Sequence, residues 1–185
     1  WEGVKSIKRL LFAARAKNLP VIYTTGVRRP DGWDAGSWRW KNSRSNERMT
    51  TPTTNLSGDT IVADIAPEPR EIVIEKHKPS AFHGTPLASF LTLLGADSLL
   101  VAGTTTSGCV RATVVDAFSD NYRVSLVEEG CFDRSQASHA LSLCDMHAKY
   151  ADVVKLDQVI KFIGTLDANL FDLPKAAPAA QSKAA

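Results

Sequence analysis

The sequence predicts a three-layer α/β/α fold with a mostly parallel central sheet. Short runs of β-branched and apolar residues alternate with segments of helical spacing along most of the chain. These β-rich runs show little polar alternation, as expected for strands that are buried on both faces of a parallel sheet. A length of 185 residues, 44% hydrophobic and 23% charged, suits one domain with a full core. We expect the domain over residues 1–170 and a flexible tail over 171–185.

The first part of the chain is expected to contain a helix, two strands and one long loop. Residues 1–18 favour a helix because apolar side chains recur on one face. Those side chains are Val4, Ile7, Leu10, Leu11 and Ala14. Strands follow at 19–25 and 71–75. The segment 26–58 between them is too long for a plain connection, so we expect a functional loop there.

The remaining elements continue the alternation of helices and strands. We expect a helix from about Pro86 to Leu94, with Thr85 as its N-cap. The further strands are expected at 98–103, 122–128 and 152–154, and the further helices at 107–120, 135–150 and from Leu156 to about Ile163. The small polar residues from Pro174 onward are typical of a disordered tail.

In an open parallel sheet, ligands bind beyond the carboxyl ends of the strands. Catalytic and binding side chains are therefore expected at the carboxyl ends of the strands. The segments concerned are Tyr23–Thr25, Ile74–Lys76, Ala102–Thr106 and Val127–Arg134.

Cys109 lies where small residues turn the chain from a buried strand into a helix. A thiol there faces free backbone N–H groups and the positive end of the helix dipole, and both favour the nucleophilic thiolate. The same N–H groups can hold the oxyanion that forms when a thiolate attacks a carbonyl. Taken alone, this setting leaves a nucleophile and a buried structural cysteine equally open.

Lys76 ends its predicted strand on the same edge of the sheet as Cys109. A cation at this edge can lower the pKa of a thiol and stabilise a developing oxyanion. The alternative is an exposed lysine at a strand end with no chemical role.

The two segments together resemble the isochorismatase-like cysteine hydrolase superfamily, over about residues 3 to 165. The matching positions are Lys76, Ser80, Ala81, Phe82, Gly84, Thr85, Gly103, Thr105, Gly108, Cys109, Val110, Arg111, Thr113, Asp116, Ala117, Asp133, Arg134 and the run 145–153. The joint motif is specific, although neither half would be alone. Within the superfamily the likeness is closest to the N-carbamoylsarcosine amidases and the related maleamate and biuret hydrolases.

This resemblance implies a metal-free amidohydrolase with a Cys–Lys–Asp triad and no cofactor. Cys109 would attack the carbonyl or carbamoyl carbon of a small amide or N-carbamoyl acid, with Lys76 beside it, and ammonia would leave. The resemblance places the oxyanion hole at the backbone N–H groups of Thr105 and Cys109, after a cis peptide between Thr104 and Thr105. It also implies that Arg134 grips a substrate carboxylate.

Three further substrate contacts come from the same resemblance, at Trp38, Lys41 and Thr104. For Trp38 and Lys41 the alternative is a solvated loop whose aromatic side chains pack on a neighbouring subunit. The resemblance further implies a homodimer or homotetramer.

The family's general base is an Asp at the end of a central strand that precedes the first helix. The sequence shown begins at that helix, so we expect about 15–40 further residues that carry the Asp. Omitting a central strand would open the middle of the sheet. Asp31 and Asp34 are poor substitutes because they lie in the long loop, where no strand aims them.

Several other classes of function are disfavoured. A net charge of +2 without long basic runs gives no nucleic-acid surface, and no apolar stretch reaches the length of a membrane helix. The N-terminus is not a signal peptide, and three cysteines do not make a disulfide framework, which together favour a cytoplasmic protein. We interpret Cys131 and Cys144, the latter on an apolar helix face, as inert.

The histidines His77, His83, His139 and His147 are interpreted as structural or surface residues, and no H-x-x-x-H metal pair exists. The metal-binding Asp/His segment of nicotinamidases is missing as well. The competing functions are an isochorismatase-type hydrolase, which generally lacks the cysteine, and a non-catalytic family member that has lost the Asp.

Overall fold

A computed structural model describes residues 2–38, 40–41 and 58–173 of the chain. Within these ranges the strands are β1 (Ile22–Gly26), β2 (Ile72–Lys76), β3 (Ser98–Thr104), β4 (Arg123–Phe132) and β5 (Asp152–Val154). The helices include α1 (Glu2–Ala16), α3 (Leu87–Leu94), α4 (Arg111–Ser119), α5 (Gln136–Lys149) and α6 (Leu156–Thr165). Three short helical turns are η1 (Trp33–Ala35), η2 (Ala63–Ile65) and the π-helical η3 (Thr106–Val110). The predicted disorder from Pro174 onward, and most of the long loop, lie outside the described residues.

The predicted elements are all present, and the differences lie at their ends. β4 continues to Phe132 instead of ending at 128, because its pairing with β3 resumes after a register shift. The helix predicted from 107 begins one residue earlier, as the π-helical turn. Pro86 is the N-cap of α3, not Thr85, although the Thr85 hydroxyl accepts a hydrogen bond from the Leu87 N–H at 3.2 Å.

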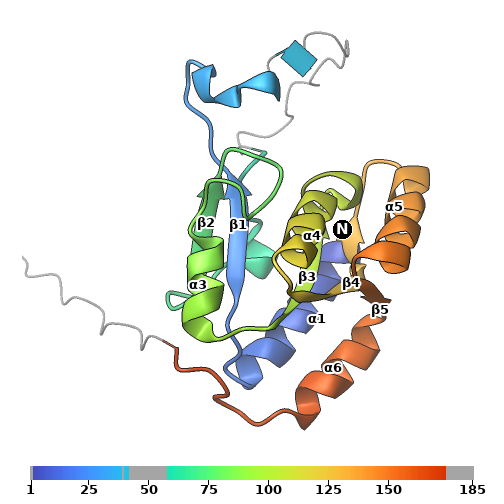
Figure 1. Cartoon of the computed structure of the whole chain (residues 1–185). Helices are drawn as coiled ribbons and strands as arrows, with labels where there is room; N and C mark the ends of the chain where they lie inside the picture. Colours follow the sequence, from blue (N-terminus) through green and yellow to red (C-terminus); the bar gives the residue numbers. More distant parts are fainter. Residues whose placement is uncertain (1, 39, 42–57, 174–185) are drawn as a thin grey trace, which may run out of the picture.

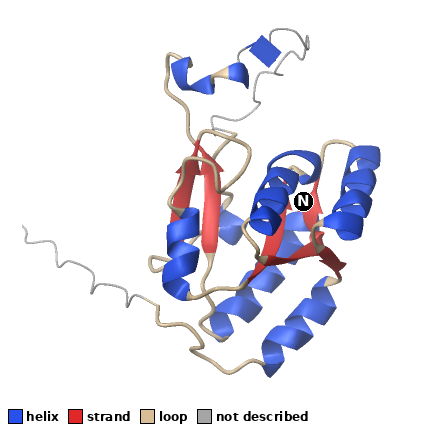
Figure 2. Cartoon of the chain, viewed as in Figure 1, coloured by secondary structure: helices blue, strands red, loops and turns tan. Residues whose placement is uncertain are grey.

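The helices lie on both sides of parallel strands, which confirms the three-layer prediction (Figures 1 and 2). On one side, the apolar faces of α1 and α6 pack with Val127 of β4. On the other side, α4 and α5 pack against Val124 and Leu126 of the same strand. Neighbouring side chains of a strand point to opposite faces of the sheet. Leu126 therefore packs against one helical layer and Val127 against the other.

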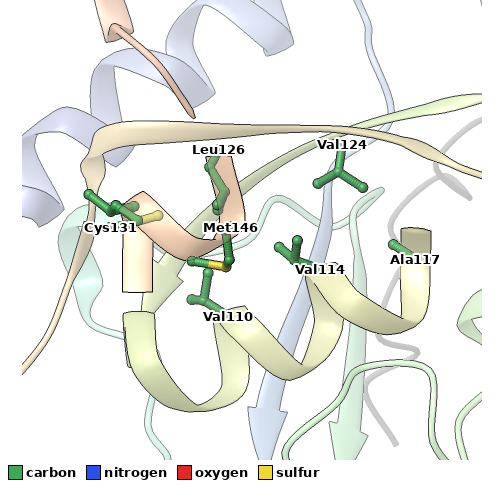
Figure 3. Packing of buried hydrophobic residues seen from close by; sticks show 8 residues of the cluster. Val110, Val114, Ala117, Val124, Leu126, Cys131 and Met146 are labelled. Carbon is green, nitrogen blue, oxygen red and sulfur yellow. The ribbon is translucent and has the colours of Figure 1, made fainter. Parts of the chain in front are cut away.

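The largest apolar cluster lies under α4, directly behind the turn that carries Cys109. Figure 3 shows Val110, Val114 and Ala117 from this helical segment facing Leu126 of β4 and Met146 of α5. Val114, Ala117, Leu126 and Met146 are fully buried. Close packing of this kind fixes the helix on the sheet, so the start of the helix has a defined position.

The strands that the structure describes form two sheets, not one. β1 pairs with β2, and β3, β4 and β5 form a second sheet in that order, all parallel. In Figure 1 the strands run from left to right as β2, β1, β3, β4 and β5, so β1 and β3 are the edges that adjoin the division. The division therefore lies in the middle of the strand order.

Within the described residues, no helix combines the length and apolar character needed to cross a bilayer.

Candidate active site

Cys109 lies in the π-helical turn between β3 and α4. Gly103, near the end of β3, has a φ of +132°, a conformation that glycine adopts readily. The peptide bond between Thr104 and Thr105 is cis, as the family resemblance implied. The Thr105 carbonyl then accepts hydrogen bonds from the N–H groups of Gly108 at 2.9 Å and Val110 at 3.2 Å. This closes a wide turn around Cys109, and π turns are frequent at functional sites.

Side chains from two other elements hold this turn in place. Asp133, just after β4, accepts a hydrogen bond from the Ser107 N–H at its Oδ2 atom, at 2.8 Å. His139 of α5 lies with its Nδ1 atom 2.9 Å from the hydroxyl of Thr106, which is fully buried. His139 therefore has a structural role, since its side chain bonds to the turn that carries Cys109. Thr105, the N-cap position, makes no side-chain capping bond of its own.

Asp133 is an ionised carboxylate in this setting. Burial acts to raise its pKa, but hydrogen bonds from Ser107 and from the Arg134 N–H outweigh burial and hold the pKa below its ordinary value. A carboxylate near the start of a helix is also favoured by the helix dipole.

Lys76 is the last residue of β2, in register with Gly26 of β1. Its ammonium group donates to the Lys78 carbonyl at 3.0 Å. No carboxylate of the described ranges forms an ion pair with it. The Asp59 side chain packs against Gly26, so closely that a Cβ on the glycine would collide with the carboxylate. This carboxylate at the end of β1 was not singled out from the sequence, because 58–60 carries no strand or helix pattern.

One threonine connects the segment after Lys76 to the helix that follows Cys109, across the division of the sheet. The Thr113 hydroxyl accepts a hydrogen bond from the Ala81 N–H at 3.0 Å and donates to the Cys109 carbonyl at 2.8 Å. Ala81 and Ser80 are buried, and the Thr85 hydroxyl donates to the Ala81 carbonyl. The spacing between Lys76 and Thr85 in the motif thus corresponds to a segment docked on α4.

Arg134 follows β4 at the same edge of the sheet and is exposed. Its guanidinium forms no ion pair with any residue that the structure describes. Its backbone N–H donates to Oδ1 of Asp133 at 2.8 Å, which anchors the residue without using the side chain. An exposed, unpaired guanidinium is suited to bind a carboxylate in bidentate fashion.

The described residues of the segment 27–41, which we call the arm and which include Trp38 and Lys41, extend past the ends of β1 and β2 in Figure 1 and stand apart from α4. The structure does not bring them together with Cys109, and their role in binding stays a prediction. Asp34 and Asp31 stabilise this arm. Asp34 accepts from the Arg29 N–H at 2.9 Å and lies 3.1 Å from Nδ1 of His77, while Asp31 pairs with the Arg29 guanidinium at 2.6 Å.

The three cysteines have different surroundings. Cys109 is partly exposed, Cys131 is buried and Cys144 is exposed. Burial raises the pKa of Cys131 to about 12, which fits the inert role predicted for it. The placement of Cys144 on an apolar face was wrong, because the buried face of α5 passes through Ser142, Leu143 and Met146. Among the described residues, no group of three or more His, Cys, Asp or Glu side chains could hold a metal ion.

Comparison with known proteins agrees with this arrangement. The Isochorismatase domain family matches residues 2–158. N-carbamoylsarcosine amidase from Arthrobacter sp is 37% identical over 167 residues, which is 88% of this chain and 62% of that protein. Maleamate amidohydrolase from Pseudomonas putida is 42% identical over 156 residues, which is 82% of this chain and 70% of that protein.

A solved structure supports the same fold. The crystal structure of a cysteine hydrolase from Pseudomonas syringae pv. phaseolicola superposes with a TM-score of 0.76 at 26% identity, over 88% of this chain and 80% of that one. The present chain spans less than two thirds of the length of the amidase from Arthrobacter sp, since it covers 62% of it.

Proposed function

Because this chain belongs to the isochorismatase family, we propose that it is an amidohydrolase with Cys109 as its nucleophile. The substrate is a small amide or N-carbamoyl acid, whose linear C–N bond is cleaved to release ammonia. One observation carries the proposal. A partly exposed thiol lies in the first turn of a helix, and Thr113 links that helix to the segment that begins at Lys76.

The reaction proceeds in two halves. The Cys109 thiolate attacks the carbonyl carbon, a C–S bond forms and the carbonyl oxygen takes up the negative charge. The backbone N–H groups of Thr105 and Cys109 stabilise this oxyanion. Collapse breaks the C–N bond, and the nitrogen leaves as ammonia after it takes the proton that the thiol gave up. Water then attacks the thioester or carbamoyl-enzyme, the C–S bond breaks and the acid is released.

Lys76 supports both halves as a cation at the carboxyl edge of β2. A positive charge there favours the thiolate over the thiol and stabilises the oxyanion, so it acts on the ground state and on the transition state. Its ammonium group already has one acceptor in the Lys78 carbonyl, which holds the side chain in one direction.

The proton of the thiol needs a base. We place this base on a carboxylate at the end of a strand that pairs with both β1 and β3, because the edges of these two parallel strands adjoin the division in the sheet. Such a strand would satisfy the backbone groups of both edges and bring a carboxylate to the same rim as Lys76 and Cys109. Asp59, beside Gly26 at the end of β1, is the alternative source.

The substrate carries a carboxylate in this proposal. Arg134 offers an exposed guanidinium for it at the edge where Cys109 lies, and Thr104 stands at the entry to the nucleophile turn. Trp38 and Lys41 would shape the pocket from the arm. Maleamate and biuret-type amides are the nearest alternatives to an N-carbamoyl acid. An isochorismatase-type hydrolase and a non-catalytic member are less favoured, since neither makes use of a thiol at this turn.

Two further proposals concern the oligomeric state of the enzyme and its location in the cell. A homodimer or homotetramer would cover exposed aromatic side chains of the arm, among them Trp33 and Trp40, which are 77% and 66% exposed. Light scattering on a sizing column measures this state directly, and a monomer would contradict it. A cytoplasmic location follows from the free cysteines and is checked by cell fractionation.

The activity is tested by ammonia release over a panel of small amides, amide acids and N-carbamoyl acids. We expect turnover of at least one acid, loss of that turnover in Cys109→Ala, and wild-type turnover in the control Cys144→Ala. A Cys109→Ala protein that releases ammonia at the wild-type rate would refute the proposal. In the same assay, a large loss of ammonia release in Asp59→Asn would assign the role of general base to Asp59 instead of to the proposed strand.

A further inference from the structure

The carboxylate of Asp133 joins two segments that the proposed reaction needs in a fixed relation. Its Oδ2 atom accepts the N–H of Ser107, two residues before Cys109, at 2.8 Å. Its Oδ1 atom accepts the N–H of Arg134 at 2.8 Å. One side chain therefore binds the backbone of the nucleophile turn and the backbone of the residue proposed to hold the substrate.

The bond from the Ser107 N–H to Asp133 takes the place of an N-cap bond at the start of the helical turn. The first N–H groups of a helix need acceptors from outside the helix, and these usually come from the side chain at the N-cap. Thr105 at that position makes no such bond. The turn therefore depends on an acceptor that lies just after β4. As a result, the position of the segment after β4 determines the position of the turn.

Both acceptor positions of the carboxylate are used, so a neutral amide of the same shape cannot replace it. An asparagine offers one oxygen, and its NH₂ group would face one of the two N–H donors. The hydrogen-bonded surroundings also keep the pKa of Asp133 below its ordinary value, so both oxygens are available as acceptors at neutral pH.

We propose that Asp133 is a positioning residue that sets the distance between Cys109 and Arg134, and so matches the site to amides that carry a carboxylate. The proposal rests on the proposed function of these two residues. A substrate held by its carboxylate at Arg134 presents its amide carbon to Cys109 only if the two segments keep their spacing. A misplacement of about 1 Å between reacting groups can lower turnover by about 100-fold.

The test compares Asp133→Asn with Asp97→Asn, a matched control at the opposite, amino end of β3. The substrates are the amide acid with the highest turnover in the panel and its methyl ester, which keeps the amide and lacks the charge. For Asp133→Asn we expect kcat to fall about 10- to 100-fold on both substrates, because the nucleophile turn shifts. We expect KM to rise for the acid alone, because only the acid uses Arg134.

A second readout needs no substrate. Hydrogen exchange of peptides that contain Ser107 and Arg134 should be slow in the wild type and in Asp97→Asn, and faster in both peptides of Asp133→Asn. This readout separates the two proposals. If no amide acid is hydrolysed, the proposed function fails, whereas the exchange data still decide whether Asp133 holds both segments.

Three results would overturn the proposal. The first is a folded Asp133→Asn protein with wild-type kcat and KM on the acid. The second is a loss of kcat with an unchanged preference for the acid over its ester. The third is fast exchange at Ser107 or Arg134 in the wild type. Should Asp133→Asn not fold, Asp133→Ser, which keeps a single acceptor oxygen, takes its place in both measurements with the same expected results.

Discussion

The two halves of the divided sheet hold their proposed catalytic side chains in different ways. In the half formed by β3, β4 and β5, several bonds from neighbouring elements fix the turn that carries Cys109, including those from Asp133 and His139. In the half formed by β1 and β2, the Lys76 side chain makes one described hydrogen bond, to a carbonyl two residues away. The proposed nucleophile is thus positioned by its own half of the sheet, whereas the position of Lys76 relative to it depends on how the two halves are joined.

Among the contacts that join the halves within the described residues, two include side-chain bonds close to Lys76 or to its strand. The first is Thr113, which binds Ala81 of the lysine segment and the Cys109 carbonyl. The second is α1. Its Leu10 and Ala13 pack on the core beside β4, while its Arg15 binds Glu71 just before β2. A change at either connection should move Lys76 relative to Cys109.

The largest effect is expected from Lys76→Met. Loss of the cation should lower kcat by about 10²–10⁴-fold, a range typical of groups that assist proton transfer and charge stabilisation. The fold should persist, because the side chain has a single described bond, to a backbone carbonyl. Steady-state ammonia release measures the effect, with Lys161→Met, at an exposed position of α6, as the control. A Lys76→Met protein with wild-type kcat would remove the lysine from the mechanism.

The next effect concerns the α1 connection. The Glu71 side chain is only 4% exposed and receives two bonds of 2.8 Å from Arg15. Arg15→Ala leaves this carboxylate buried without its partner, so the free energy of unfolding should fall by about 3 kcal/mol. Arg9→Ala, which breaks an ion pair that is 59% and 82% exposed, should cost less than about 1 kcal/mol. Urea unfolding of both variants measures the difference, and equal costs would contradict the role given to α1.

Thr113→Val should have a smaller effect on stability and a specific effect on activity. It removes the acceptor of the Ala81 N–H and the donor to the Cys109 carbonyl, at a cost of about 1–3 kcal/mol. Turnover should fall in a protein that remains folded, and Thr113→Ser, which keeps the hydroxyl, should restore most of it. If Thr113→Val and Thr113→Ser have the same kcat, the hydroxyl does not link the two halves.

The smallest effect is a dependence of stability on pH. Burial acts to raise the pKa of Glu71, but the bond from Arg15, the bond from the Glu68 N–H and the nearby arginine charges together outweigh burial and keep the pKa below the ordinary value of 4.5. Because the folded pKa is depressed, the stabilisation is fully present above pH 4.5 and is lost as the pH falls through the lower folded value. The difference in unfolding free energy between the wild type and Glu71→Gln should therefore narrow on acidification. A difference that stays constant from neutral pH down to about pH 3, below the range in which such carboxylates usually ionise, would contradict this.

The order of elements along the chain was sufficient to predict part of the site. Parallel strands bring their carboxyl ends to one edge, so the sequence alone assigned Lys76 and Cys109 to the same rim. The cis peptide came with the family resemblance, which also singled out the segment from Ser80 to Thr85 but not its contact with α4.

Other features depend on contacts between segments far apart in the chain. The bond from Asp133 to Ser107 spans 26 positions, and no local pattern encodes it. The exposure of Cys144 was missed because it lies beside the buried positions of α5, where one residue of helix rotation decides between core and solvent. The wide turn at Cys109 was also missed, since helical spacing does not distinguish the first π-helical turn from an α-helix.

The central claim, that Cys109 is the nucleophile, is tested most directly by trapping its covalent intermediate. The enzyme is mixed with an amide acid from the panel, quenched in acid during turnover, digested and mapped by mass spectrometry. We predict an acyl or carbamoyl adduct on the peptide that contains Cys109, with unmodified Cys131 and Cys144. Steady ammonia release with no adduct on Cys109, or with the adduct on another residue, would contradict the account.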